Sequence, residues 1–236
     1  MLTIVTPNLN NASYLEGNIL AIKGLVIPFE HIIVDGGSTD GSLDIIARYP
    51  HVKLVRQTEK TGMYGAIHQG IKEAKGEYLT YVNADDRIVP KGFERMYQEI
   101  SKGKNNFVYS DGYYDYVLEN RRELGKGRRW GKFFLKHGCM PSIQPSTIFT
   151  KKLYDEVGGL RYDKFRICGD FDLFLRMAKA ANSKFRYLPV ISTIFMKRGD
   201  SLGDRNDDVY IREFNANNLP RPTLLVKIFY RIFKYV

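Results

Sequence analysis

The chain has 236 residues, of which 44% are hydrophobic and 26% are charged, and it contains two cysteines. This composition is that of a folded globular protein, and it excludes an intrinsically disordered chain and a small disulfide-stabilised one. The net charge of +10 at pH 7 favours an anionic partner: a phosphorylated substrate, an anionic membrane surface or nucleic acid.

Strand-like and helix-like segments alternate through the first part of the chain. Predicted strands cover 2–6, 31–34, 52–56 and 78–82, and the predicted helices between them cover 13–22, 43–46 and 64–75. Such alternation predicts a parallel sheet with helices on both faces. Because ligands of these sheets bind beyond the carboxyl ends of the strands, the polar residues after the first, second and fourth strands should meet at one edge.

The second half of the chain is less regular. Its predicted elements are a strand and hairpin at 107–116, a short helix at 151–157, an amphipathic helix at 171–181 and a strand at 184–195 that Pro189 interrupts. We find no linker rich in Gly, Ser or Pro in this half. We therefore expect one α/β domain over residues 1–200, followed by a C-terminal tail over residues 201–236.

The tail contains an apolar stripe with the spacing of an amphipathic helix over 223–236. The stripe consists of Leu224, Leu225, Ile228, Phe229, Ile232, Phe233 and Val236. Lys227, Arg231 and Lys234 lie toward the other side. This pattern is typical of a helix that lies in the plane of an anionic membrane, and the segment is too short and too charged to span one. The alternative is a helix packed on the domain or in a dimer interface.

The start of the chain lacks the basic residues and long apolar core of a signal peptide, and no apolar run reaches the roughly 18 residues that a membrane span needs. Cys139 and Cys168 lack CxxC spacing, so we interpret them as reduced thiols and not as zinc ligands. These features predict a cytoplasmic protein, peripheral on the inner face of the cell membrane if the tail binds lipid.

Six short segments of the chain resemble, in order and spacing, those of family 2 glycosyltransferases of bacterial surface-polysaccharide pathways. They are 6–10 (TPNLN), 34–42 (VDGGSTDGS), 62–71 (GMYGAIHQGI), 83–86 (NADD), 144–149 (QPSTIF) and 169–176 (GDFDLFLR). The chain departs from the family pattern where Gly65 replaces an Asp, His68 an Asn, Asn83 the first acid of a D-x-D motif and Gly169 a Glu.

This resemblance, which covers about residues 2–194, implies a GT-A-like α/β fold with a Rossmann-like, mostly parallel sheet. It implies a nucleotide-binding half over about residues 1–100 and an acceptor half over about 101–200. The implied reaction is inverting, metal-dependent transfer of a sugar from a nucleotide-diphosphate sugar, by expectation a UDP-sugar, to a saccharide acceptor.

Asp85 and Asp86 follow the fourth predicted strand and are the candidate metal ligands. A departing nucleotide diphosphate carries concentrated negative charge, which a hard divalent cation stabilises as a Lewis acid. Such cations prefer oxygen ligands. We expect Mn²⁺ or Mg²⁺ on one of the two aspartates, with the other on the ribose or on a metal-bound water. The alternative is that the pair caps a turn.

The nucleotide contacts come from the loops after the first two strands. By resemblance, Asp35 contacts the nucleotide base, and Gly36 leaves room for the ligand to approach the backbone. Thr6, Pro7 and Asn8 are expected to form the wall around the nucleotide. The alternative for Asp35 is an Asx-turn that caps the following helix.

Asp170, at the start of the predicted helix 171–181, is the candidate general base. It would take the proton of the acceptor hydroxyl as that oxygen attacks the anomeric carbon. A single carboxylate fits inversion, since retention by double displacement needs a second, nucleophilic one. The alternative is that Asp170 caps the helix, with Asp172 in its first turn. Family position assigns the donor-sugar or acceptor side to Gly62, Tyr64, Asp111, Gln144 and Asp172.

Two other functions stay open at this point. A sugar nucleotidyltransferase would need a Gly-rich phosphate loop with a basic residue near the N-terminus, which residues 8–11 do not provide. A non-enzymatic module that binds nucleic acid or a membrane would use the positive charge, but no nucleic-acid-binding motif accompanies it. The expected partners are therefore a nucleotide sugar and a saccharide acceptor, polyprenyl-linked if the tail binds a membrane, and no nucleic acid.

Overall fold

The computed structural model describes residues 1–199 and 207–232. Its strands are β1 (Leu2–Asn8), β2 (Phe29–Asp35), β3 (Val52–Arg56), β4 (Tyr78–Tyr81), β5 (Arg87–Ile88), β6 (Phe107–Tyr116), β7 (Arg121–Gly125), β8 (Thr147–Thr150) and β9 (Phe185–Lys197). Its helices are α1 (Ala12–Lys23), α2 (Ser42–Ala47), α3 (Gly62–Lys72), α4 (Pro90–Ile100), α5 (Gly131–Lys136), α6 (Lys151–Glu156), α7 (Gly169–Lys179), α9 (Asp207–Ala216) and α10 (Leu224–Ile232), with a 3₁₀ turn at Val117–Glu119.

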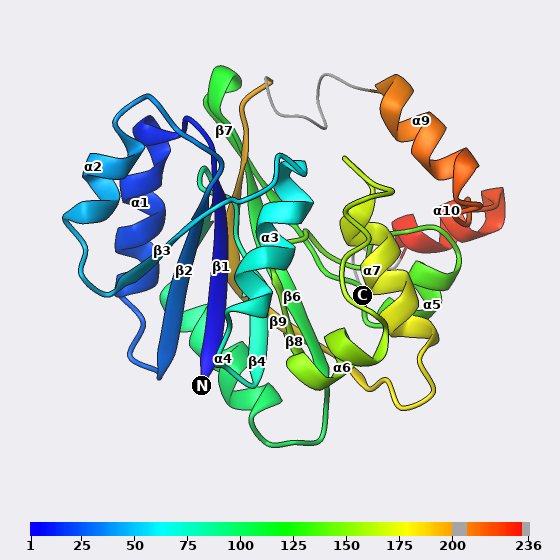
Figure 1. The fold of residues 1–236 in the computed structure, drawn as a ribbon. Coiled ribbons are helices and arrows are strands. Elements are labelled where there is room, and N and C mark those ends of the chain that lie inside the picture. The colour runs from blue at the N-terminus through cyan, green and yellow to red at the C-terminus, as the bar shows by residue number, and fades with distance from the viewer. Residues whose placement is uncertain (200–206, 233–236) are drawn as a thin grey trace.

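The described strands form one sheet with helices on both faces (Figure 1). The strand order is β3-β2-β1-β4-β8-β6-β9-β5, and β7 pairs with β6. The pairs among β1, β2, β3 and β4 are all parallel, as the strand–helix alternation predicts. This α/β architecture, a mostly parallel sheet flanked by helices, is the one predicted from the sequence.

Strand β1 lies in the middle of the parallel half and is buried along its whole length. Successive side chains point to opposite faces, so Ile4 joins the cluster that includes Phe93 of α4, whereas Val5 joins the cluster that includes Ile67 of α3. A strand covered on both faces is rich in apolar and β-branched residues without strict alternation, which is the pattern of residues 2–6 (LTIVT).

Strand β9 continues through Pro189 instead of ending there. The proline is exposed and falls where the pairing of β6 with β9 shifts register, between Leu188 and Ile191. A proline has no N–H to donate to a strand ladder, and a bulge accommodates it. The predicted interruption is therefore a bulge, and beyond it β9 runs on to Lys197.

The two described helices of the predicted tail pack on the rest of the molecule. Phe214 of α9 is buried in the main core cluster, where its ring centroid lies 5.3 Å from that of Phe171 in α7. Phe229 of α10 stacks on Trp130, beside α5, at 5.4 Å. Phe233, Lys234 and Val236 of the predicted stripe lie outside the described residues. None of the helices within residues 1–199 and 207–232 is long and apolar enough to cross a membrane.

Candidate active site

A cavity of about 590 Å³ lies at the carboxyl ends of the parallel strands. Its wall includes Asn8 at the end of β1, Gly36 just after β2 and Asp85 just after β4. Asp170 of α7 and Arg198, the residue after β9, complete the same wall. The expectation that the polar residues after these strands meet at one edge is confirmed.

Most of the predicted site residues line this cavity. Those that do are Pro7, Asn8, Gly36, Gly62, Tyr64, Asp85, Gln144 and Asp170. Those that do not are Thr6, Asp35, Asp86, Asp111 and Asp172. In every residue of this second group the side chain is buried and bonded to a neighbour in the fold.

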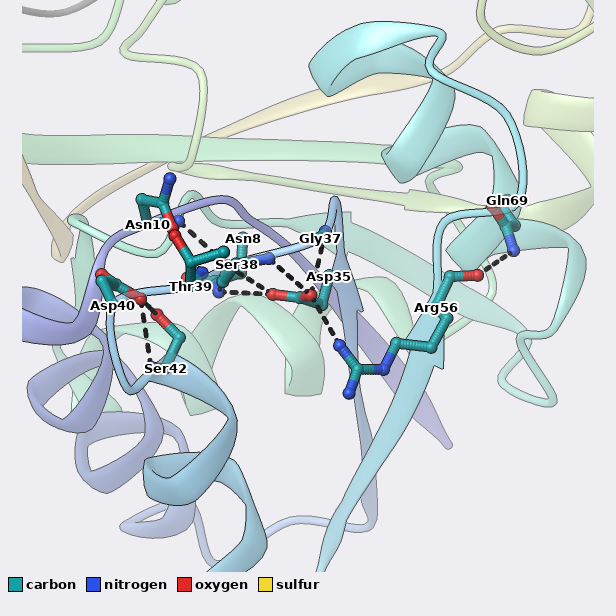
Figure 2. A network of polar contacts seen from close by, with 10 residues as sticks. All are labelled: Asn8, Asn10, Asp35, Gly37, Ser38, Thr39, Asp40, Ser42, Arg56 and Gln69. Carbon is teal, nitrogen blue, oxygen red and sulfur yellow. Dashed lines mark hydrogen bonds and ion pairs between the residues drawn. The ribbon is translucent and has the colours of Figure 1, made fainter.

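The loop after β2 is organised around the buried carboxylate of Asp35 (Figure 2). Asn8 Nδ2 and Arg56 Nη1 donate to it at 3.0 Å each, and so do the backbone N–H groups of Gly37 and Ser38. Ser38 Oγ donates at 2.5 Å. Burial acts to raise the pKa of Asp35, but the hydrogen bonds from Ser38, Asn8 and Gly37 outweigh it and hold the pKa below its ordinary value. The bonds from the N–H groups of Gly37 and Ser38 to Asp35 are those of an Asx-turn, the alternative interpretation of this residue.

Thr6 and Asp111 also serve the fold. Thr6 Oγ1 lies 3.1 Å from Nε2 of the buried His31, two residues before β1 ends. Asp111 Oδ1 accepts from the Gly127 N–H at 2.7 Å and from the Tyr187 hydroxyl at 2.8 Å. Both side chains are buried in packed parts of the sheet and do not line the cavity, and their roles toward the nucleotide and the donor sugar stay predictions.

The two adjacent aspartates after β4 have different surroundings. Asp85 lines the cavity, and its Oδ2 lies 3.3 Å from Nη1 of Arg198. Asp86 is 1% exposed, and its Oδ1 accepts from the backbone N–H of Met196 at 2.9 Å. Burial, and then the charge of Asp85, raises the pKa of Asp86 well above its ordinary value. Of the two predicted metal ligands, only Asp85 faces the cavity, and Asp86 ties the end of β9 to the loop after β4.

Asp170 lies in the first turn of α7, two residues after the N-cap residue Cys168, and it lines the cavity. Its Oδ1 accepts from the Phe171 N–H at 2.8 Å and from the Tyr64 hydroxyl at 3.2 Å. Burial raises the pKa of Asp170 above its ordinary value, against the opposing effect of these two hydrogen bonds. Asp172, in contrast, forms an ion pair with Arg176 at 2.7 Å and does not line the cavity, and its assignment to the substrate side stays a prediction.

Three cations on the cavity wall were not predicted: Arg166, Lys197 and Arg198. Arg198 donates to Asn11 Oδ1 at 3.0 Å, and its guanidinium lies 4.6 Å from the ring centroid of Tyr14. A signal for two of them was present in the sequence. Because β9 runs parallel to β6, the rule that ligands gather at carboxyl ends applies to residues 197 and 198 as well.

At two departures from the family pattern, Gly65 and Gly169, a larger side chain would be crowded by its neighbours. A Cβ at Gly65 would lie 1.7 Å from Oγ1 of Thr61, so no larger side chain fits while Thr61 stays in place. A Cβ at Gly169 would lie 2.7 Å from the ring of Tyr64. The space that a glutamate would need before Asp170 is thus taken by a tyrosine that bonds to Asp170 itself.

Residues 3–158 match the sequence profile described as Glycosyl transferase family 2. The chain belongs to this family. Of the three functions open from the sequence alone, membership of this family favours glycosyl transfer.

Curated relatives agree with this assignment. Glycosyltransferase GlyG of Streptococcus pneumoniae is 34% identical over 49% of this chain and 40% of its own length. A PGL/p-HBAD biosynthesis glycosyltransferase of Mycobacterium bovis is 26% identical over 95% of this chain and 86% of its own length. Chondroitin synthase of Pasteurella multocida is 25% identical, and the chain spans only 22% of it.

Solved structures share the fold at low identity. S. aureus TarS 1–349 in complex with UDP-GlcNAc superposes with a TM-score of 0.69 at 17% identity, over 89% of this chain and 63% of that one. The mannosyltransferase PcManGT of Pyrobaculum calidifontis, in complex with GDP-Man and Mn²⁺, has a TM-score of 0.66 at 17% identity, over 92% and 64%. The chain therefore spans somewhat less than two thirds of these proteins.

Proposed function

We propose that this glycosyltransferase moves a sugar from a nucleotide-diphosphate sugar to a hydroxyl group of a saccharide acceptor, with inversion at the anomeric carbon. The observation that carries the proposal is Asp170, a carboxylate on the cavity wall beside the strand ends that present Asn8 and Gly36. Two similar structures hold UDP-GlcNAc and GDP-Man, which supports a nucleotide-sugar donor. A UDP-sugar is the donor that we expect.

Asp170 is suited to act as the general base. A carboxylate with a raised pKa is a stronger base than an exposed one. Tyr64 and the N–H of Phe171 hold its Oδ1, which orients the carboxylate at the start of α7. In the proposed step the acceptor oxygen bonds to the anomeric carbon, its proton passes to Asp170, and the bond to the diphosphate breaks.

The carboxylates on the cavity wall support inversion. Among the described residues that line the cavity, Asp85 and Asp170 are the only acids. Asp85 is paired with Arg198, so Asp170 is the carboxylate left for the acceptor. Retention by double displacement would need a further carboxylate as the nucleophile.

Asp85 is the residue that we propose holds a divalent cation, Mn²⁺ or Mg²⁺. The part of the chain that the structure describes contains no cluster of three or more His, Cys, Asp or Glu side chains around a metal site. A single carboxylate still fits, because Mg²⁺ at nucleotide sites takes its other ligands from phosphates and water. When bound, the cation supplies Lewis-acid stabilisation of the diphosphate. Lys197, Arg198 and Arg166 would add charge-assisted hydrogen bonds to it.

Titration of UDP and GDP into the protein tests the donor site. We expect saturable binding of one nucleotide with Mn²⁺ or Mg²⁺ present, and clearly weaker binding after a chelator is added. Equal nucleotide affinity with and without the chelator would show that nucleotide binding does not depend on a divalent cation. Absence of binding for any nucleoside diphosphate would remove the donor as well.

The acceptor that we propose is lipid-linked, because α10 and the segment of α5 expose an apolar surface. It consists of Leu224, Leu225, Ile228 and Ile232 of α10 with Trp130 and Phe133, each between 40% and 79% exposed. Lys227, Arg231 and Arg129 are exposed beside it. Apolar side chains with basic neighbours suit an anionic membrane, where the former enter the interface and the latter meet lipid headgroups. Phe229 and Tyr230 instead pack on the domain.

The variant Leu225→Glu tests this surface, because Leu225 is 79% exposed and its replacement leaves the core intact. Its partitioning onto vesicles that contain anionic lipid should fall about tenfold, the effect of losing one buried leucine. Flotation with neutral and anionic vesicles measures it. Leu118→Glu, at a leucine that is 82% exposed on the 3₁₀ turn, is the matched control and should bind like wild type. Equal flotation of the two variants would exclude a membrane role for α10.

A further inference from the structure

Glu213 of α9 places a buried carboxylate against the segment that precedes Asp170. Its Oε1 accepts from the backbone N–H of Arg166 at 2.6 Å. Its Oε2 accepts from the N–H groups of Ile167 at 3.1 Å and Cys168 at 2.9 Å. Glu213 is 9% exposed, so water competes little for these bonds. A single side chain thus fixes three consecutive peptide groups from 45 or more residues away in the chain.

These peptide groups lead directly into α7. Cys168 is the N-cap residue of α7, which begins at Gly169. The N–H groups at the start of a helix have no partner inside the helix, and a negative charge beside them is favourable. Glu213 therefore supplies from outside the contacts that determine where α7 starts.

The same segment reaches the reacting carboxylate through Tyr64. The carbonyl of Ile167 accepts from the Tyr64 hydroxyl at 2.7 Å, and the same hydroxyl lies 3.2 Å from Asp170 Oδ1. A displacement of residue 167 would therefore move Tyr64 and, with it, Asp170. Phe171 and Phe214, whose centroids are 5.3 Å apart, hold α9 against α7.

We propose that Glu213 is a positioning residue for Asp170, an inference that rests on the function proposed above. It does not contact the substrate and acts through the backbone of residues 166–168. Simple packing of α9 would be served by Phe214 alone, without a second acid close to Asp170. The two oxygens of Glu213 accept from three N–H donors at once, which no apolar side chain at this position could do. By this inference Glu213 is the residue of α9 that positions the reacting carboxylate.

The test compares Glu213→Gln with wild type in two measurements. The amide has one acceptor oxygen and one NH₂ group, which faces at least one backbone N–H and breaks that contact. Hydrogen exchange of the amides of residues 166–168 should become faster. Near saturating donor, kcat should fall about tenfold to a hundredfold, since small misplacements of a reacting group have effects of this size. KM for the donor should change less than kcat, because Glu213 holds the peptide group of Arg166 and not the side chain that we propose contacts the diphosphate.

Two further variants keep the result interpretable. Asp208→Asn makes the same acid-to-amide change at an exposed site of α9 and should match wild type in both measurements. Glu213→Asp keeps the charge with a shorter reach, and its kcat should lie between those of wild type and Glu213→Gln. It also serves as the test variant if Glu213→Gln does not fold.

Unchanged exchange at 166–168 would overturn the inference, and so would faster exchange with an unchanged kcat, because the role would then be structural only. Failure of the proposed function gives a different result: wild-type protein would turn over no nucleotide sugar. In that case the exchange measurement still decides whether Glu213 holds the segment before α7.

Discussion

Replacing Asp170 by Asn should lower kcat by about 10²- to 10⁴-fold, the usual contribution of a general base. The amide keeps the shape of the side chain and can still accept from the Tyr64 hydroxyl and the Phe171 N–H. It cannot take the acceptor proton. Affinity for the nucleoside diphosphate, measured by calorimetry, should stay within about twofold, because the loss falls on the transition state and not on ground-state binding.

The matched control for this change is Asp163→Asn, the same substitution at an exposed aspartate of the loop that leads to α7. It should retain wild-type kcat. In wild-type protein, kcat should decline on the acid side at a pH above the ordinary aspartate value, because the pKa of Asp170 is raised and the base works only when ionised. An Asp170→Asn variant with normal turnover would exclude Asp170 as the base.

Replacing Asp85 by Asn should abolish the effect of the divalent cation on nucleotide binding. A neutral amide is a poorer ligand for a hard cation than a carboxylate, and the pair with Arg198 loses its charge as well. We expect UDP or GDP to bind the variant with the same affinity in Mn²⁺ and in chelator, and about tenfold or more below wild type in Mn²⁺. Calorimetric titration measures both.

Two controls sharpen this prediction. Asp44→Asn changes an exposed acid on α2 and should leave metal-dependent binding at the wild-type level. Asp86→Asn tests the division of roles between the neighbours, since Asp86 bonds to the N–H of Met196 and does not line the cavity. That variant should lose thermal stability more than metal dependence. The opposite pattern, with Asp86 controlling the metal response and Asp85 indifferent, would contradict the assignment.

The sequence was sufficient to predict the parallel half of the fold, for a physical reason. In β1, β2 and β4 the local signal is strong, because strands covered on both faces are continuous apolar runs bounded by polar turns. Asn8, Gly36 and Asp85 follow these strands directly, so their common place in the cavity could be inferred from strand order alone.

The direction of side chains could not be predicted in the same way. Asp85 and Asp86 are adjacent and identical, and one faces the cavity while the other bonds to Met196 of β9. That partner lies 110 residues away in the chain, so no local pattern reveals it. The same holds for Asp111, whose carboxylate is used by Gly127 and Tyr187.

The helices that were missed divide into two kinds. Over α4 the signal existed: Pro90 stands in the first turn, and the buried Phe93, Met96 and Ile100 follow at helical spacing. For α9 the contacts that fix its position are tertiary. Glu213 bonds to three backbone N–H groups of a loop that is 45 or more residues away in the chain, and no local sequence pattern indicates such contacts. The C-terminal apolar stripe was predicted. Which of its side chains pack, such as Phe229, and which stay exposed, such as Leu225, depends on where α5 lies and could not be predicted from the stripe alone.

The most direct test of the account is to analyse the product of transfer. Wild-type protein is incubated with a panel of nucleotide sugars, Mn²⁺ and a saccharide acceptor, and the anomeric configuration of the new linkage is determined by NMR. We predict transfer from one donor class with a configuration opposite to that of the donor, and no such product from Asp170→Asn. A product that retains the donor configuration, or equal product from the variant, would contradict single displacement with Asp170 as the base.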